Sequence, residues 1–233
     1  MSVTTHFQDL GVIEYKKAWD YQQRLFDGTV QMKFDNRKLP EEERPKTRNY
    51  LLFCEHPHVY TLGKSGDMAN LLINEEKLKE IGATYFPINR GGDITYHGPG
   101  QIVAYPIFDL DYFFTDIHKY LRFLEDVIIK VLEKYGLEGQ RSPGETGVWL
   151  DVGTDRARKI CAMGIKASRW VTMHGLAFNV NSNLEYFGYI VPCGITDKAV
   201  TSLDVEVGRT LDYAKVKQEV KEAFAEVFDL KYA

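Results

Sequence analysis

The chain has 233 residues, of which 44% are hydrophobic and 27% charged, a composition typical of a globular protein that buries a sizeable core. Its 29 basic and 33 acidic side chains give a formal net charge of −4, which disfavours a nucleic-acid partner. The first residues lack the basic and apolar regions of a signal peptide, and no apolar run approaches the roughly 20 residues that span a bilayer. We therefore expect a cytoplasmic protein with no membrane contact.

The first half of the chain predicts a helix followed by strands. Apolar side chains recur at helical spacing from Tyr15 to about Met32. The apolar segment 50–56 predicts a buried strand that runs on into residues 57–63, and residues 101–110 predict another central strand.

The cleanest helical pattern of the chain runs from Ile117 to Tyr135. Thr115 or Asp116 can cap its start, and Gly136 can end it.

Three short strand-like runs follow this helix, at residues 146–152, 158–167 and 171–180. The connections between them are short, which favours an antiparallel meander. A last amphipathic helix covers 211–228. Because no linker or change of composition marks a boundary, we expect one catalytic domain over 1–233, with a core at about 10–210. Helices that flank a mixed, mostly antiparallel sheet predict an α+β or mixed α/β fold.

The stretch RGGDITYHGPGQ, residues 90–101, first suggests a phosphate-binding loop. It lacks the spacing of both common phosphate-loop fingerprints, and it leads into a strand where those fingerprints open a helix. Strand alternation would instead send Thr95 and His97 to one face, which suggests a pocket wall with Arg90 at one end. A glycine-rich hairpin with a surface arginine and a buried histidine fits the residues equally well.

The three cysteines have no spacing typical of a zinc site or a disulfide framework, which points to a reducing compartment. Cys54 and Cys161 lie in apolar strands and are expected to be inert. Cys193 stands between Pro192 and Gly194, so its thiol is expected at a bend, displayed for reaction. A reactive thiol needs a basic or cationic neighbour. Spacing does not choose among the candidates, which are His97, His174, Lys159 and Lys166.

Alternation along residues 158–167 puts Lys159 on the face of Cys161, Met163 and Ile165. An amine on such an apolar face would be partly buried, which favours a proton acceptor over a spectator charge. A lysine at the strand end that reaches out to water is the alternative.

Six segments taken together are similar to the octanoyltransferases of lipoate biosynthesis, also called lipoyl(octanoyl) transferases. They occur in the order of that family and are spread over about residues 10–210. The segments are EHPHVYTLG (55–63), RGGDITYHGPGQIVAYP (90–106), TGVWLD (146–151), KICAMGIK (159–166), HGLAFNV (174–180) and VPCGI (191–195).

The resemblance implies the fold of the biotin and lipoate protein ligases and an octanoyl-[acyl carrier protein]:protein N-octanoyltransferase. Such an enzyme moves an octanoyl group from acyl carrier protein to a lysine of lipoyl domains, in 2-oxoacid dehydrogenases and the glycine cleavage H protein. By resemblance, Cys193 is the nucleophile that carries the acyl group as a thioester, and Lys159 is the acid and base. The acyl-binding residues matched by the family are Arg90, Gly91, Gly92, Asp93, Ile94, Thr95, Tyr96, His97, Ala162, Met163, Gly164, Gly175, Leu176 and Ala177.

The departures from the family pattern are small. His58 stands where many members have a second proline, Asp93 occupies a variable position, and residues 37–48 look like a solvated insertion. We expect a monomer that needs no cofactor and no metal ion.

Three other functions remain open on the sequence. An ATP-dependent lipoate or biotin protein ligase of the same fold would use a similar glycine-rich segment and lysine but no Cys193 thiol. A cysteine hydrolase would pair Cys193 with His97 or His174. A non-catalytic module would bind acyl groups or lipoyl domains without forming an acyl-enzyme.

Overall fold

The computed structural model describes residues 2–191 and 199–233. In this part of the chain a large sheet has the strand order β10-β8-β9-β6-β2-β1-β11, with β7 paired to β8, and a small sheet has the order β4-β3-β5. The strands of the large sheet are β1 Val3–Val12, β2 Asn49–Glu55, β6 Gln101–Ile107, β7 Val148–Leu150, β8 Arg158–Ser168, β9 Val171–Asn179, β10 Ala199–Val200 and β11 Leu230–Tyr232. The strands of the small sheet are β3 Val59–Leu62, β4 Thr84–Pro87 and β5 Ile94–His97.

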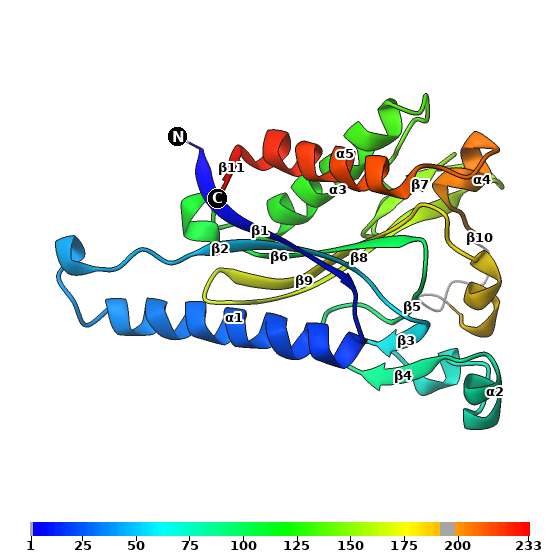
Figure 1. The fold of residues 1–233 in the computed structure, drawn as a ribbon, viewed down its shortest axis with the longest axis horizontal. Coiled ribbons are helices and arrows are strands. Elements are labelled where there is room, and N and C mark those ends of the chain that lie inside the picture. Colours follow the sequence, from blue (N-terminus) through cyan, green and yellow to red (C-terminus); the bar gives the residue numbers. More distant parts are fainter. Residues whose placement is uncertain (1, 192–198) are drawn as a thin grey trace.

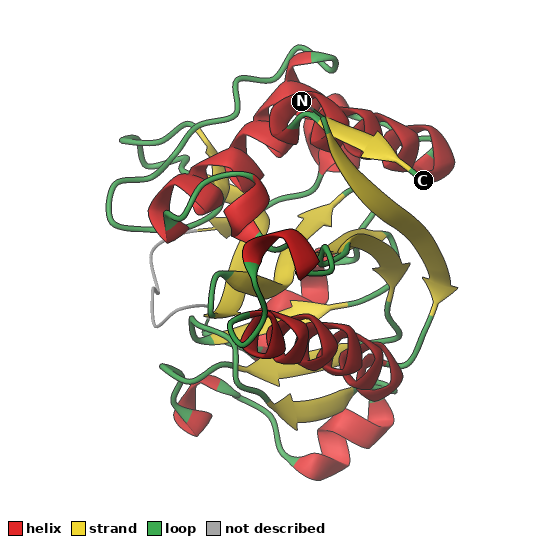
Figure 2. Cartoon of the chain, turned by 90° about the vertical axis from the view of Figure 1, so that its left-hand side faces the viewer, coloured by secondary structure: helices red, strands yellow, loops and turns green. Residues whose placement is uncertain are grey.

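The helices cover both faces of the large sheet (Figure 1). Helix α1 packs on one face, and α3 and α5 pack side by side on the other. Figure 2 shows both chain ends on the same side of the molecule, where β1 pairs in parallel with β11. The α-helices are α1 Tyr15–Asn36, α2 Glu75–Glu80, α3 Ile117–Glu133, α4 Leu203–Val207 and α5 Tyr213–Phe228. The short 3-10 helices are η1 Glu41–Glu43, η2 Met68–Asn70, η3 Leu110–Tyr112 and η4 Leu184–Tyr189.

The predicted fold class is confirmed: the sheet is mixed and mostly antiparallel, with helices on both sides. The pairs β7·β8 and β8·β9 are antiparallel, so the expected meander is also present. In the large sheet, parallel pairing is found at β1·β2, β1·β11 and β10·β8, which join segments distant in sequence, and in the small sheet at β3·β4.

The prediction that strand 50–56 continues into residues 57–63 is wrong. β2 ends at Glu55, and β3 begins at Val59 in the other sheet. Pro57 lies in the break, where it has no N–H to donate to a ladder and restricts the residue before it. This break turns the chain away from the large sheet and lets β3 and β5 form a wall beside it.

Pro106 in the middle of the large sheet is accommodated by an unusual backbone at His174. The β6·β9 pairing ends at Ala104–Leu176. His174 lies two residues before Leu176, at the level of Pro106, and has φ +62°. Pro106 offers no N–H there, and the His174 N–H donates instead to Oε1 of Gln22 on α1, at 3.1 Å. Left-handed backbone at a non-glycine residue is strained and tends to occur at functional sites.

Helix α3 begins as the sequence predicts, with Asp116 as the capping residue. The Asp116 carboxylate accepts a hydrogen bond from the Lys119 N–H, at 2.9 Å. The helix ends at Glu133, and Gly136 follows with φ +72°. At the start of α1, by contrast, the side chain of Glu14 makes no capping hydrogen bond.

This difference gives a test of the capping interaction. Asp116→Ala should lower the free energy of unfolding by about 1 kcal/mol, because the Lys119 N–H loses its acceptor. Glu14→Ala, at the cap position without such a bond, should change it by less than about 0.5 kcal/mol. Urea denaturation of the two variants measures both values, and equal losses would contradict the assignment.

Candidate active site

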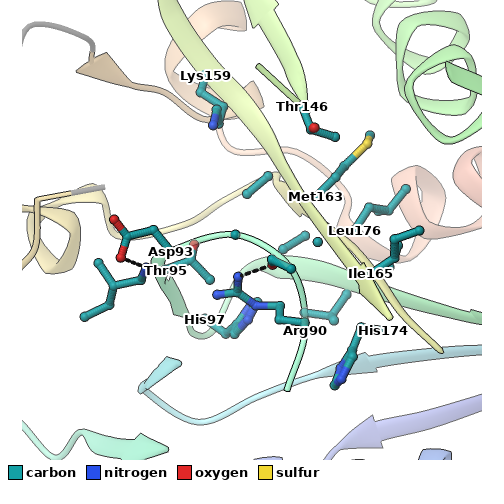
Figure 3. A pocket seen from close by; sticks show the side chains of 18 of the residues that line it. Arg90, Asp93, Thr95, His97, Thr146, Lys159, Met163, Ile165, His174 and Leu176 are labelled. Carbon is teal, nitrogen blue, oxygen red and sulfur yellow. Dashed lines mark hydrogen bonds between the residues drawn. The ribbon is translucent and has the colours of Figure 1, made fainter. Parts of the chain in front are cut away.

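A pocket of about 450 Å³ lies where the segment of residues 90–97 crosses the edge of β8. One wall consists of this segment, and another consists of residues 162–165 of β8 and 174–177 of β9 (Figure 3). The inner end is closed by the buried side chains of Tyr15, Val103 and Tyr105. Lys159 and residues 144–146 line the opposite, more exposed part.

The structure brings nearly all of the predicted acyl-binding residues to this pocket. Among the described residues, Tyr96 is the one predicted member that does not line it, since its ring packs on Tyr186 and its hydroxyl bonds His58 Nδ1 at 2.7 Å. Cys193 lies outside the described residues. The predicted residues that line the pocket are Arg90, Gly91, Gly92, Asp93, Ile94, Thr95, His97, Lys159, Ala162, Met163, Gly164, Gly175, Leu176 and Ala177.

The glycine-rich segment is fixed to β8 by its backbone. The Gly91 N–H donates to the Ile165 carbonyl at 2.9 Å. A Cβ atom on Gly164 would lie 2.9 Å from the Gly91 oxygen, and one on Gly63 would lie 2.2 Å from the Gly92 oxygen. The glycines therefore permit close backbone contact between the segment, β8 and the end of β3, rather than phosphate binding.

Arg90 holds the same segment to the small sheet. Its guanidinium is buried and donates to the Thr61 carbonyl at 3.0 Å and to the Thr61 hydroxyl at 3.1 Å. It also donates to the Gly91 carbonyl at 2.9 Å. Arg90, Thr95 and His97 all line the pocket, and Arg90 is buried rather than at the surface.

Asp93 connects the glycine-rich segment with the chain that leads to Cys193. The Asn70 amide donates to the Asp93 carboxylate at 2.7 Å, while the Asn70 carbonyl accepts from the Val191 N–H at 2.8 Å. The Leu72 N–H donates to the Tyr189 carbonyl at 3.0 Å. Val191 is two residues before Cys193 in the sequence, so Asn70 links the pocket wall to the approach to that residue.

His97 belongs to a chain of buried hydrogen bonds. Gln101 donates to Asn179 Oδ1 at 2.8 Å, so its Oε1 is the atom that accepts from His97 Nδ1, also at 2.8 Å. Asn179 in turn donates to the Thr201 carbonyl at 2.9 Å. This arrangement fixes the neutral tautomer of His97 with an unprotonated Nε2.

Burial keeps the histidines of the site neutral. It lowers the pKa of His97 to about 3, with His56 as a further cause, and the pKa of His174 to about 3, with Arg90 as a further cause. A Cys–His ion pair of the kind that a cysteine hydrolase uses requires an imidazolium, which neither ring carries at pH 7. Burial therefore disfavours a Cys193–imidazolium ion pair with either ring.

Lys159 reaches the pocket because β8 contains an extra residue. Val148 of β7 pairs with Cys161, but Trp149 pairs with Lys159, so Ile160 is the extra residue of a β-bulge. Since Val148 and Trp149 point to opposite faces, their partners Cys161 and Lys159 do too. The predicted common face for Lys159 and Cys161 is therefore wrong: Lys159 lies on the opposite face of β8 and lines the pocket, while Cys161 is buried in the core against α3.

The surroundings of the two candidate lysines differ. The half-buried Lys159 ammonium lies 4.5 Å from the centre of the Trp149 ring and makes no ion pair within the described residues. Lys166 does not line the pocket; it contacts Gln23 Oε1 at 3.4 Å and lies over the Phe26 ring of α1. The geometry therefore selects Lys159 over Lys166 as the lysine that faces the pocket.

The two cysteines predicted to be inert are buried thiols. Burial raises the pKa of Cys54 and of Cys161 well above the range in which a thiol reacts as thiolate at pH 7.

Several lining residues were not selected from the sequence. Thr146 and Asn179 lie within segments that carry the resemblance, so closer attention to those motifs would have found them. Tyr15 opens a helix far from any motif, and no pattern in the sequence links it to the pocket.

A family model described as the lipoyl protein ligase A/B catalytic domain matches residues 15–225. The chain belongs to this family. It is 60% identical to an octanoyltransferase of Christiangramia forsetii over the whole of both chains, and 59% identical to one of Flavobacterium psychrophilum over 98% of each. An octanoyltransferase of Bacteroides fragilis is 49% identical over 94% of each chain. These matches confirm the resemblance and place the chain among the octanoyltransferases of the family, which are acyltransferases.

Solved structures of ligases have the same fold. A lipoate-protein ligase A bound with ATP superposes with a TM-score of 0.69 over 100% of this chain and 88% of that one, at 14% identity. A bipartite lipoate protein ligase of Thermoplasma acidophilum gives 0.67 over 100% and 85%, at 15% identity. At this level of identity the likeness concerns the fold. Among the described residues, none of the helices is long and apolar enough to cross a membrane.

The buried histidines predict how stability depends on pH. Their pKa values are about 4 for His56 and about 3 for His97 and His174, all below the value of about 6.5 in an unfolded chain. Between these limits the unfolded chain binds protons that the folded chain does not, so the free energy of unfolding falls as the pH is lowered. Each histidine contributes up to about 1.4 kcal/mol per pH unit in that range.

Urea denaturation at pH 7.5 and 5.5 should show a loss of about 4 kcal/mol at the lower pH, about 1.4 kcal/mol for each of the three histidines. His97→Gln, which keeps a polar side chain but does not titrate, should reduce that loss by about a third. Equal stability of the wild-type chain at both pH values would show that the three rings are protonated, or solvated, in the folded state.

Proposed function

We propose that this octanoyltransferase takes its octanoyl group from acyl carrier protein and passes it to a lysine of lipoyl domains. Cys193 carries the group as a thioester between the two partners, and Lys159 acts as the acid and base. The acceptors are the lipoyl domains of 2-oxoacid dehydrogenases and the glycine cleavage H protein. The reaction needs no cofactor, and we place the enzyme in the cytoplasm as a monomer.

The observation that carries the proposal is the position of Lys159 beside an apolar pocket. Met163, Leu176 and Ala177 give that pocket its apolar walls, and the glycine-rich segment closes it from the side. Burying an acyl chain there contributes about 0.8 kcal/mol for each CH₂ group. The Lys159 ammonium, which has no carboxylate partner within the described residues, lies at the same pocket. Charge and protons would move there during acyl transfer.

The two steps conserve bonds and protons. In the first, the Cys193 thiolate attacks the thioester carbonyl of the carrier, a new thioester forms, and the carrier thiol leaves with a proton from the Lys159 ammonium. In the second, the amine of the acceptor lysine attacks the enzyme thioester, an amide forms, and the Cys193 thiolate is released while Lys159 takes the proton of the amine. Exchange between thioesters is nearly balanced and amide formation is downhill, so ATP is not consumed.

Intact mass spectrometry tests the covalent step. Incubation with octanoyl-loaded carrier protein should add one octanoyl group, mapped to Cys193, and a lipoyl domain should remove it. Cys193→Ala should give no adduct and no transfer.

The role of Lys159 is tested in the same assay. Lys159→Met should slow transfer by about 10² to 10⁴-fold, the contribution of a positioned acid and base. Lys166→Met provides the matched control, since this lysine lies on the same strand but outside the pocket lining.

Two outcomes would overturn the proposal. ATP-dependent modification of the lipoyl domain by Cys193→Ala would identify a ligase. Release of free octanoate with little effect of Lys159→Met would identify a hydrolase.

A further inference from the structure

Glu125 is a fully buried carboxylate that the proposed mechanism does not use. It lies on the inner face of α3 among the buried apolar residues Leu124, Val127 and Ile128, and its side chain has 0% exposure. A carboxylate in such surroundings is costly unless it is paired and hydrogen-bonded. Its partners therefore show what it holds in place.

The two oxygens of Glu125 have different partners. Oε2 accepts from Arg122 at 2.6 Å and from Arg141 Nε at 2.9 Å, and both guanidinium groups are partly exposed. Oε1 accepts from the backbone N–H of Gly147 at 3.1 Å. The two guanidinium groups thus compensate the negative charge at Oε2, and Oε1 fixes the peptide N–H of Gly147.

Arg141 and Gly147 are the two ends of the loop that contributes Gly144, Glu145 and Thr146 to the pocket. One carboxylate therefore joins both ends of this loop to α3. Thr146 of this loop and Lys159 both line the pocket (Figure 3).

Gly147 also fixes the bulge that turns Lys159 into the pocket. Its φ is +123°, and a Cβ atom there would lie 2.5 Å from the Cys161 oxygen, so only glycine fits. Val148 follows directly and starts β7, whose register against β8 shifts by one residue between Cys161 and Lys159. A displacement of Gly147 would reach Lys159 through this pairing and through the Trp149 ring beneath its ammonium.

We propose that Glu125 is a positioning residue, which holds Gly147 and the 144–146 loop so that the β7·β8 bulge presents Lys159 to the acyl pocket. The inference rests on the proposed role of Lys159. Glu125 itself does not touch the pocket; it acts through Gly147 and Trp149. Small displacements of a catalytic group are enough to lower a rate by about 10²-fold.

Two substitutions separate positioning from stability. Glu125→Met keeps a side chain of similar length in an apolar surrounding but removes both acceptors, and the two arginines can turn to solvent because they are partly exposed. Glu125→Gln keeps an oxygen that can accept from Gly147. Asp126→Asn is the matched control, because Asp126 pairs with the same Arg141 but at the surface.

We expect Glu125→Met to lower kcat for octanoyl transfer by about 10-fold to 10²-fold with less than about a threefold change in KM for the octanoyl-loaded carrier protein. Exchange of the Gly147 amide proton, followed by NMR, should become at least about tenfold faster. Glu125→Gln should restore most of both values, and Asp126→Asn should leave both as in the wild-type enzyme.

The outcomes distinguish this inference from the proposed function. If Lys159→Met is inactive while Glu125→Met keeps the wild-type kcat, positioning by Glu125 is wrong and the role of Lys159 stands. If Lys159→Met is fully active, the proposed function is wrong. If kcat in the Glu125 variants follows only their loss of thermal stability, with Gly147 exchange unchanged, Glu125 has a merely structural role.

Discussion

A backbone hydrogen bond between Gly91 and Ile165 is the contact on which the site depends. It places the glycine-rich segment along the edge of β8, so that a pocket remains between this segment and the large sheet. The contact is possible because Gly164 has no Cβ atom, which would lie 2.9 Å from the Gly91 oxygen. Arg90 and Asn70 then hold the segment from its other sides, through Thr61 and Asp93.

The large sheet supplies the opposite wall through two departures from regular strand geometry. The bulge at Ile160 turns Lys159 to the pocket face, and the left-handed backbone of His174 accommodates Pro106 in the neighbouring strand. Each departure is supported from a helix, the first by Glu125 of α3 through Gly147 and the second by Gln22 of α1. The two helical layers thus do more than cover the sheet, because each one fixes a strand segment that lines the pocket.

The sequence predicts those parts of the fold that depend on local pattern. Helix α3, its Asp116 cap and the β7–β9 meander follow from spacing and short connections, and the resemblance selects Lys159 and most of the pocket wall. Strand β1 was not predicted, because it is largely exposed and is held by parallel pairing with β11 from the far end of the chain. The face of Lys159 was predicted wrongly because strict alternation does not allow for a bulge. That bulge depends on Gly147 and Glu125, which precede Lys159 by 12 and 34 residues in the chain.

The central claim is that an octanoyl chain bound to the enzyme lies between the glycine-rich segment and β8, with its reactive end at Lys159. A crystal structure of the octanoyl-enzyme, trapped without an acceptor domain, tests this claim most directly. The acyl chain should run along Gly91, Met163 and Leu176, and its carbonyl should lie about 3 Å from Lys159 Nζ, within hydrogen-bonding distance. An acyl chain bound outside this pocket, or a thioester remote from Lys159, would contradict the account.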